Sequence, residues 1–151
     1  MIKNLESSER IRILENNYVG HLGYIWQQSP FVVPITFFYD GENKSIIGYS
    51  GDGHKIKAMR KNPTVSMAVE EVESVTKWRS VLIQGKFEEI KGGDAKYILH
   101  KFVEGVKDII TEKGKKRPSC LKEFTNKINS EVISVVYRIR IEDILGKVRD
   151  D

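Results

Sequence analysis

The stretch that decides the fold is residues 47–55, which read Ile47-Gly48-Tyr49-Ser50-Gly51-Asp52-Gly53-His54-Lys55. Residues 44–49 are predicted to form a β-strand, and residues 54–61 have the spacing of a short helix that Asn62-Pro63 ends. A glycine-rich turn therefore joins a strand directly to a helix. The segments on both sides of this joint are also strand-like, so it lies within a mainly β domain.

Strand patterns fill most of the chain around this joint. The connections between strands are too short for parallel crossovers, and Asp40-Gly41-Glu42-Asn43 is a hairpin signal. Because closure removes exposed sheet edges, we expect an all-β fold with peripheral helices: a six-stranded antiparallel Greek-key split barrel. Gly20, Gly23 and Gly85 are expected to mark bends or bulges. The predicted strands are residues 18–26, 31–39, 44–49, 64–72, 78–90 and 131–141.

Helical patterns lie outside these strands. Ser7-Ser8 can cap a helix that continues to residue 16 or 17, and residues 94–113 form the clearest amphipathic helix. A short helix over residues 121–127 is also predicted. The sequence has no internal repeat or composition shift that marks a boundary, so residues 1–151 are expected to form a single domain.

The composition is that of a globular protein, with 151 residues, 40% of them hydrophobic, and a net charge of +4. The first residues lack the apolar run of a signal peptide, and no stretch approaches the roughly 20 apolar residues of a membrane-spanning helix. We therefore expect a cytoplasmic protein with no membrane partner. The basic residues of segment 113–127 form a solvated surface or attract anions. Nucleic acid is not an expected partner, because interleaved aromatic residues are lacking there.

The turn at residues 50–55 has the features of an anion site. Its two glycines let backbone N–H groups converge, and the start of a helix adds free donors and a positive dipole end. Ser50 offers a hydroxyl, while Lys55 and His54 offer charge. Asp52 is expected to cap the helix rather than to face the anion. The alternative is an ordinary strand-to-helix turn.

Two further segments favour a ligand in this region. Pro34 cannot donate to a sheet ladder, so its strand is an edge or an interrupted pairing whose backbone groups are free to meet a planar ring. In strand 78–90, alternation places Ser80 on one face and Arg79 on the other. Arg79 lies among aliphatic neighbours, where it needs a carboxylate or a phosphate as its partner.

The order of these pieces resembles the flavin-binding split-barrel proteins of the pyridoxamine 5'-phosphate oxidase-like group. The branch that looks closest is that of the nitroimidazole-resistance (Nim-type) proteins. The resemblance covers residues 18–90 and the closing segment 133–146. The pieces that carry it are Val33-Pro34-Ile35-Thr36, the stretch 47–55, Asn62-Pro63, and Trp78-Arg79-Ser80-Val81 followed by Gly85.

The resemblance implies a homodimer with two FMN molecules at its interface. It implies that Ser50, His54 and Lys55 hold the phosphate and that Ser80 meets the ring or the ribityl chain. The residues implied to border the ribityl chain and the isoalloxazine are Val33, Pro34, Ile35, Thr36 and Tyr49.

Two departures from the group narrow the function. Pyridoxamine oxidases resemble one another in having a basic residue at the position of Phe37. They also share a C-terminal stretch rich in Trp and Arg that binds the substrate, and residues 146–151 lack this composition. Vitamin B6 oxidation is therefore not expected. Gly48 stands where Nim-type proteins often carry a histidine, so chemistry attributed to that histidine does not transfer directly.

The leading hypothesis is an FMN-dependent oxidoreductase that takes electrons from a nicotinamide donor and passes them to a small acceptor, with a nitroaromatic as one candidate. The alternative is a non-catalytic module that binds flavin or haem, and FAD or a deazaflavin remains open in place of FMN. No side chain is assigned as a catalytic acid or base. No metal is expected, because His21, His54, His100 and Cys120 lack metal-ligand spacing.

Overall fold

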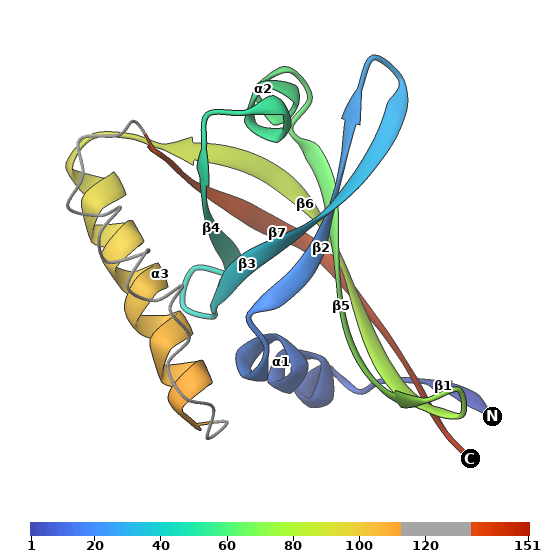
Figure 1. Cartoon of the computed structure of the whole chain (residues 1–151). Helices are drawn as coiled ribbons and strands as arrows, with labels where there is room; N and C mark the ends of the chain where they lie inside the picture. The colour runs from blue at the N-terminus through green and yellow to red at the C-terminus, as the bar shows by residue number, and fades with distance from the viewer. Residues whose placement is uncertain (113–133) are drawn as a thin grey trace.

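The computed structural model describes residues 1–112 and 134–151, and it confirms a β architecture with peripheral helices (Figure 1). The helices are α1 (Ser7–Asn16), α2 (His54–Lys61) and α3 (Gly93–Glu112). The strands are β1 (Ile2–Asn4), β2 (Val19–Trp26), β3 (Ser29–Asp40), β4 (Ser45–Gly51), β5 (Thr64–Ser74), β6 (Lys77–Ile90) and β7 (Ser134–Asp150).

The strands form one antiparallel sheet that closes into a barrel. Their order is β1-β7-β4-β3-β2-β5-β6, and β6 also pairs with β7. This additional pairing joins strands β2 to β7 into a ring and leaves only β1 outside it, so the ring itself has no free ends. Figure 1 shows α3 along one flank of the ring, with α2 at one end and α1 at the other.

The described sheet has seven strands rather than the six predicted. β1 pairs with the end of β7, where Ile2 lies opposite Arg149 and Asn4 opposite Lys147. Three residues are too few to show a periodicity, and β7 continues to Asp150, well beyond the predicted end at residue 141. The predicted helix at 121–127 and the first residues of the predicted last strand lie outside the described residues.

Gly85 marks an irregularity, as predicted, whereas Gly20 and Gly23 do not. The β6–β7 register shifts between Gln84 and Gly85, because Gln84 lies opposite Asp143 and Gly85 opposite Ile141. β2 instead keeps an unbroken register with β3 through both of its glycines. The bulge, one of the two predicted alternatives there, is absent from this pairing, and the bend stays a prediction. At Gly20 the lack of a side chain serves close packing, since a Cβ atom would lie 3.1 Å from the Met67 sulfur.

Two apolar clusters hold the elements together. The larger fills the barrel, where Phe37, Tyr137 and Leu22 are completely buried. The second lies outside the barrel, where the apolar face of α3, including Phe102 and Val106, covers Ile47 of β4 and Val136 of β7. Successive residues of β4 point to opposite faces and therefore contribute side chains to both clusters. No helix in residues 1–112 or 134–151 has the length and apolar character that would let it cross a membrane.

Candidate functional site

The first part of β3 has an open edge. β2 pairs with β3 from Ser29 to Thr36, whereas β4 pairs with it only from Phe37 to Asp40. The side of β3 away from β2 is therefore left without a paired strand from Ser29 to Thr36 in the described structure. The predicted edge around Pro34 is confirmed.

The register decides which backbone groups face this edge. Phe37 N–H donates to the Tyr18 carbonyl at 2.8 Å, so bonded and non-bonded pairs with β2 alternate from there. The backbone N–H and C=O groups of Ile35 and Val33 point to β2, while the backbone polar groups of Pro34 and Thr36 point to the open side. The two sets also differ in their side chains, because Ile35 is buried in the barrel and Pro34 is exposed. Pro34 thus occupies a position where no N–H is needed.

The start of α2 provides backbone donors that the helix does not use. Lys57 N–H makes the first helical bond, to the Gly53 carbonyl at 3.1 Å, so the N–H groups of His54, Lys55 and Ile56 precede the ladder. No side chain of residues 1–112 or 134–151 caps them. A Cβ atom at Gly51 or Gly53 would meet nothing within 4 Å. The turn therefore leaves space above its backbone that an anion could fill.

Lys55 is the cation closest in sequence to these donors. Its side chain is half-buried, and burial lowers its pKa. Within the described residues it has no ion pair or hydrogen bond. Ser50 precedes Lys55 by five residues, and its hydroxyl donates to the Gly51 carbonyl at 2.9 Å. Lys55 thus combines one of the N–H groups that precede the helical ladder with a half-buried side chain that has no counter-charge among the described residues, and this combination is suited to binding a phosphate.

Asp52 does not cap α2, and that prediction was wrong. Gly53 is the N-cap residue, and the Asp52 carboxylate lies 3.1 Å from the Arg60 guanidinium. Arg60 also pairs with Glu89 at 2.8 Å, which raises the pKa of Arg60 and lowers that of Glu89. The Arg60 bridge thus draws the Asp52 carboxylate to the side and ties α2 to the end of β6.

An aromatic cluster that the sequence analysis missed adjoins His54. Tyr24 and Phe31 stack with ring centroids 5.4 Å apart, and the Tyr24 hydroxyl lies 2.9 Å from His54 Nδ1. The Trp26 ring meets the His54 ring edge-on at 5.6 Å. Tyr24 and His54 are 30 residues apart, so no local pattern could have joined them. His54 is therefore held against the β2–β3 hairpin at the mouth of the candidate anion site.

Two predicted site residues lie away from this corner. The Tyr49 ring packs near Phe102 of α3, with centroids 6.5 Å apart. Ser80 lies near the start of β6. Tyr49 lies beside the other end of β6, because Tyr49 and Ile90 both pair with Val136 of β7. Ten residues of strand span roughly 33 Å. A single chain thus groups Ser50, His54 and Lys55 but does not bring Ser80 to them.

The outward face that carries Ser80 is partly apolar. Pro34, His21, Ala68, Leu82 and Leu145 follow one another across five strands as successive cross-strand partners. Leu82 is 39% exposed and Leu145 is 50% exposed. On the same face, His21 Nδ1 lies 3.0 Å from Glu70 Oε1.

Gly48 has no room for the histidine that Nim-type proteins often carry at this point. A Cβ atom there would lie 2.3 Å from Tyr137 Cζ, because the Tyr137 ring covers its cross-strand partner. Tyr137 is completely buried, its hydroxyl has no partner among the described residues, and burial raises its pKa. Tyr137 thus takes the place that a side chain at residue 48 would need.

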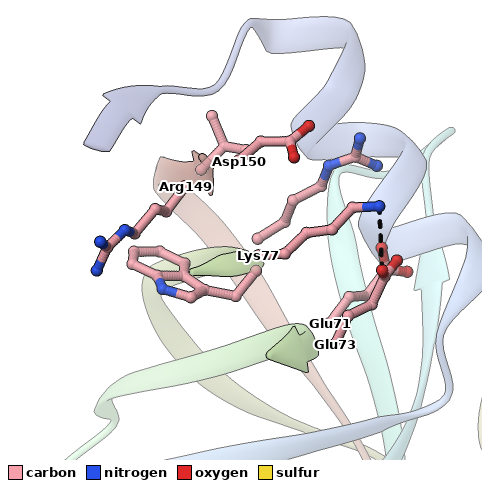
Figure 2. Close-up of a pocket in the computed structure, with 8 residues that line it drawn as sticks. Glu71, Glu73, Lys77, Arg149 and Asp150 are labelled. Carbon is pink, nitrogen blue, oxygen red and sulfur yellow. Dashed lines mark ion pairs between the residues drawn. The ribbon is translucent and has the colours of Figure 1, made fainter. Parts of the chain in front are cut away.

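Arg79 lies in a cavity at the far end of the β5–β6 hairpin (Figure 2). Glu71 lies opposite it in the register, but the Glu71 carboxylate accepts a hydrogen bond from Asn17 at 2.8 Å, and the predicted carboxylate or phosphate partner of Arg79 stays a prediction. Figure 2 shows Lys77 paired with Glu73 in the same cavity, at 3.2 Å. None of the predicted cofactor residues lines this cavity. Within the described ranges, no group of three or more His, Cys, Asp or Glu residues is arranged to hold a metal ion.

The closed ring, the open edge of β3 and the start of α2 define a split-barrel protein with a candidate anion site at one corner. The chain belongs to the Pyridoxamine 5'-phosphate oxidase family, whose model matches residues 6–148. This confirms the resemblance drawn from the sequence.

Solved structures agree with this assignment. A FAD-binding protein from Mesorhizobium loti is 25% identical, with a TM-score of 0.77 over 100% of this chain and 98% of its own. A 5-nitroimidazole antibiotic resistance protein homologue from Bacteroides thetaiotaomicron shares the fold at 19% identity, with a TM-score of 0.67 over 98% and 87% of the two chains. A FAD- and haem-binding protein from Mycobacterium smegmatis does so at 17% identity, with a TM-score of 0.72 over 99% and 74%.

Proposed function

We propose that this protein is a flavin-dependent oxidoreductase that binds FMN along the open edge of β3 and at the start of α2. The observation that carries the proposal is Lys55, a half-buried cation without a counter-charge in the described structure, in the first turn of α2, where the helix does not use the leading N–H groups. The family assignment and the likeness to a FAD-binding protein support a flavin as the ligand.

The residues would divide the work along the cofactor. Lys55, Ser50 and the α2 N–H groups would bind the phosphate, and the backbone of Pro34 and Thr36 would meet the polar edge of the ring. The flavin, when bound, supplies hydride and electron transfer. The chain would orient the ring against β3 and exclude water from one side of it. Vitamin B6 oxidation is not part of the proposal, because Phe37 is apolar and completely buried in the barrel.

The active unit in this proposal is a homodimer. The outward row from Pro34 to Leu145 carries exposed apolar side chains that a second copy would cover. Ser80 is on the same face as Leu82, two residues away along β6. The Ser80 of one chain would therefore approach the flavin of the other, which reconciles its implied role with its distance from Lys55.

Leu82→Glu should convert the dimer into a monomer, because it places a charge in the apolar row of the interface. Sedimentation equilibrium should give twice the chain mass of 17.4 kDa for the wild type and the mass of one chain for the variant. Flavin occupancy should fall along with the dimer. Val75→Glu, at a residue 85% exposed in the β5–β6 turn, is the matched control and should stay dimeric. A monomeric wild type would refute the shared interface.

The flavin and its turnover are tested separately. Purified protein should release FMN on denaturation, as identified by chromatography. Anaerobic titration with NADPH and NADH should then bleach the bound flavin, and steady turnover should follow when a nitroaromatic acceptor is added. Bleaching without turnover, or no bleaching, would favour the alternative of a non-catalytic flavin- or haem-binding module. A chain that takes up no added flavin would contradict the proposal.

A further inference from the structure

The face of α2 that carries His54 also carries two lysines over an aromatic ring. Lys57 Nζ lies 5.4 Å from the centroid of the Trp26 ring and Lys61 Nζ lies 5.1 Å from it. His54, Lys57 and Lys61 are three and four residues apart, so they share one side of the helix. Both lysines are exposed, and neither has an ion pair within the described part of the chain. Two cations thus rest on an indole ring with no counter-charge.

The aromatic side of this pair continues into the β2–β3 hairpin. Trp26 is half-buried and Phe31 is 38% exposed, so both keep accessible ring surface. The centroid of the His54 ring lies 5.6 Å from that of Trp26 and 5.1 Å from that of Phe31, so His54 is a neighbour of both rings. The cluster is therefore continuous with the candidate phosphate corner, since His54 is the first residue of α2.

We propose that Trp26, Phe31, Lys57 and Lys61 form a subsite for the ADP portion of a dinucleotide. A purine has a planar face that stacks on exposed aromatic rings, and Arg or Lys beside such rings binds the attached phosphates. A single phosphate needs only Lys55 and the donors at the helix start, so the additional cations Lys57 and Lys61 indicate a second phosphate. A polyanion would draw the two ammonium groups from the indole face and free that face for the base.

Two kinds of dinucleotide contain an ADP portion: FAD, bound as the cofactor itself, and a nicotinamide dinucleotide that donates electrons. For either dinucleotide the inference rests on the proposed function. The subsite can nevertheless be measured without flavin, because ADP alone contains the chemistry that it recognises.

The test uses the full chain in a Trp78→Phe background, which leaves Trp26 as the only tryptophan. ADP should quench the Trp26 fluorescence, and adenosine should do so more weakly because it lacks the phosphates. Calorimetry should show at least a tenfold loss of ADP affinity in Lys57→Gln/Lys61→Gln. Lys77→Gln, at a lysine in the distant cavity of Figure 2, should leave the affinity unchanged. No binding of ADP, or equal binding by both variants, would overturn the subsite.

Flavin titrations of the same proteins identify the source. Wild-type binding of FAD at least tenfold tighter than FMN, lost in the double lysine variant, would assign the subsite to FAD. Equal binding of both flavins, with NADPH affinity lost in the variant, would assign it to the electron donor. ADP binding by a chain that binds no flavin would refute the proposed function and leave the subsite standing.

Discussion

Lys55→Ala is expected to weaken FMN binding about 10- to 100-fold, the loss that follows when a charged hydrogen bond to a phosphate is removed. Lys55 is half-buried and has no partner among the described residues, so its ammonium group is available to the anion. The measurement is a fluorescence titration of the flavin-free protein with FMN. The fold should be unchanged, because the side chain contributes no internal ion pair there.

The affinity should also depend on pH in a defined direction. Burial lowers the pKa of Lys55, so the charged form opposes folding, and this penalty is relieved as the pH rises from the lowered pKa toward the ordinary value. A dianionic phosphate instead favours the charged form. FMN affinity should therefore be highest below the lowered pKa and decline as the pH rises through it, and Lys55→Ala should lose this decline.

Lys96→Ala is the matched control, because Lys96 is an exposed lysine on α3, away from the corner. It should bind FMN as the wild type does. Circular dichroism and the unfolding midpoint establish that both variants are folded. Equal FMN affinity in Lys55→Ala and the wild type would show that the phosphate is held elsewhere, even if the protein binds flavin.

The sequence predicted the barrel well where one strand face is buried. Along β5 and β6, alternate residues such as Val69, Val81 and Ile83 enter the core, and that burial imposes a two-residue period. β1 could not be found in this way, because its three residues are all exposed and gain their structure from pairing with β7 at the other end of the chain. Pairing over such a distance leaves no local signal.

The candidate site was also predicted only where its signal is local. The corner at Ser50 to Lys55 could be predicted because its glycines and the start of the helix are consecutive in the sequence. The difference between Pro34, which faces the open edge, and Ile35, which faces the core, depends on which strands pair with β3. The aromatic cluster depends on contacts between the β2–β3 hairpin and α2. The position of the Asp52 carboxylate depends on its ion pair with Arg60, which also pairs with Glu89. These tertiary contacts override local preference.

Gly85→Ala is expected to lower the free energy of unfolding by about 3 kcal/mol, the upper part of the usual range for overpacking a core. A Cβ atom at Gly85 would lie 2.3 Å from the Arg140 carbonyl oxygen and 2.9 Å from Ile139 Cγ2. The Arg140 oxygen belongs to the backbone of β7, beside the shift in the β6–β7 register, so it cannot rotate away as a side-chain tip can. Relief requires the two strands that close the ring to separate.

Gly23→Ala separates this clash from the general effect of replacing a strand glycine. The nearest atom to a Cβ there is 3.6 Å away, an ordinary contact, and Gly23 also lies within a paired strand. Its stability should stay within about 0.5 kcal/mol of the wild type in urea unfolding. The difference between the two variants measures how tightly β6 and β7 approach at the closure. Similar unfolding midpoints for both would mean that the ring can open at Gly85 without strain, and the closed barrel would then have to be revised.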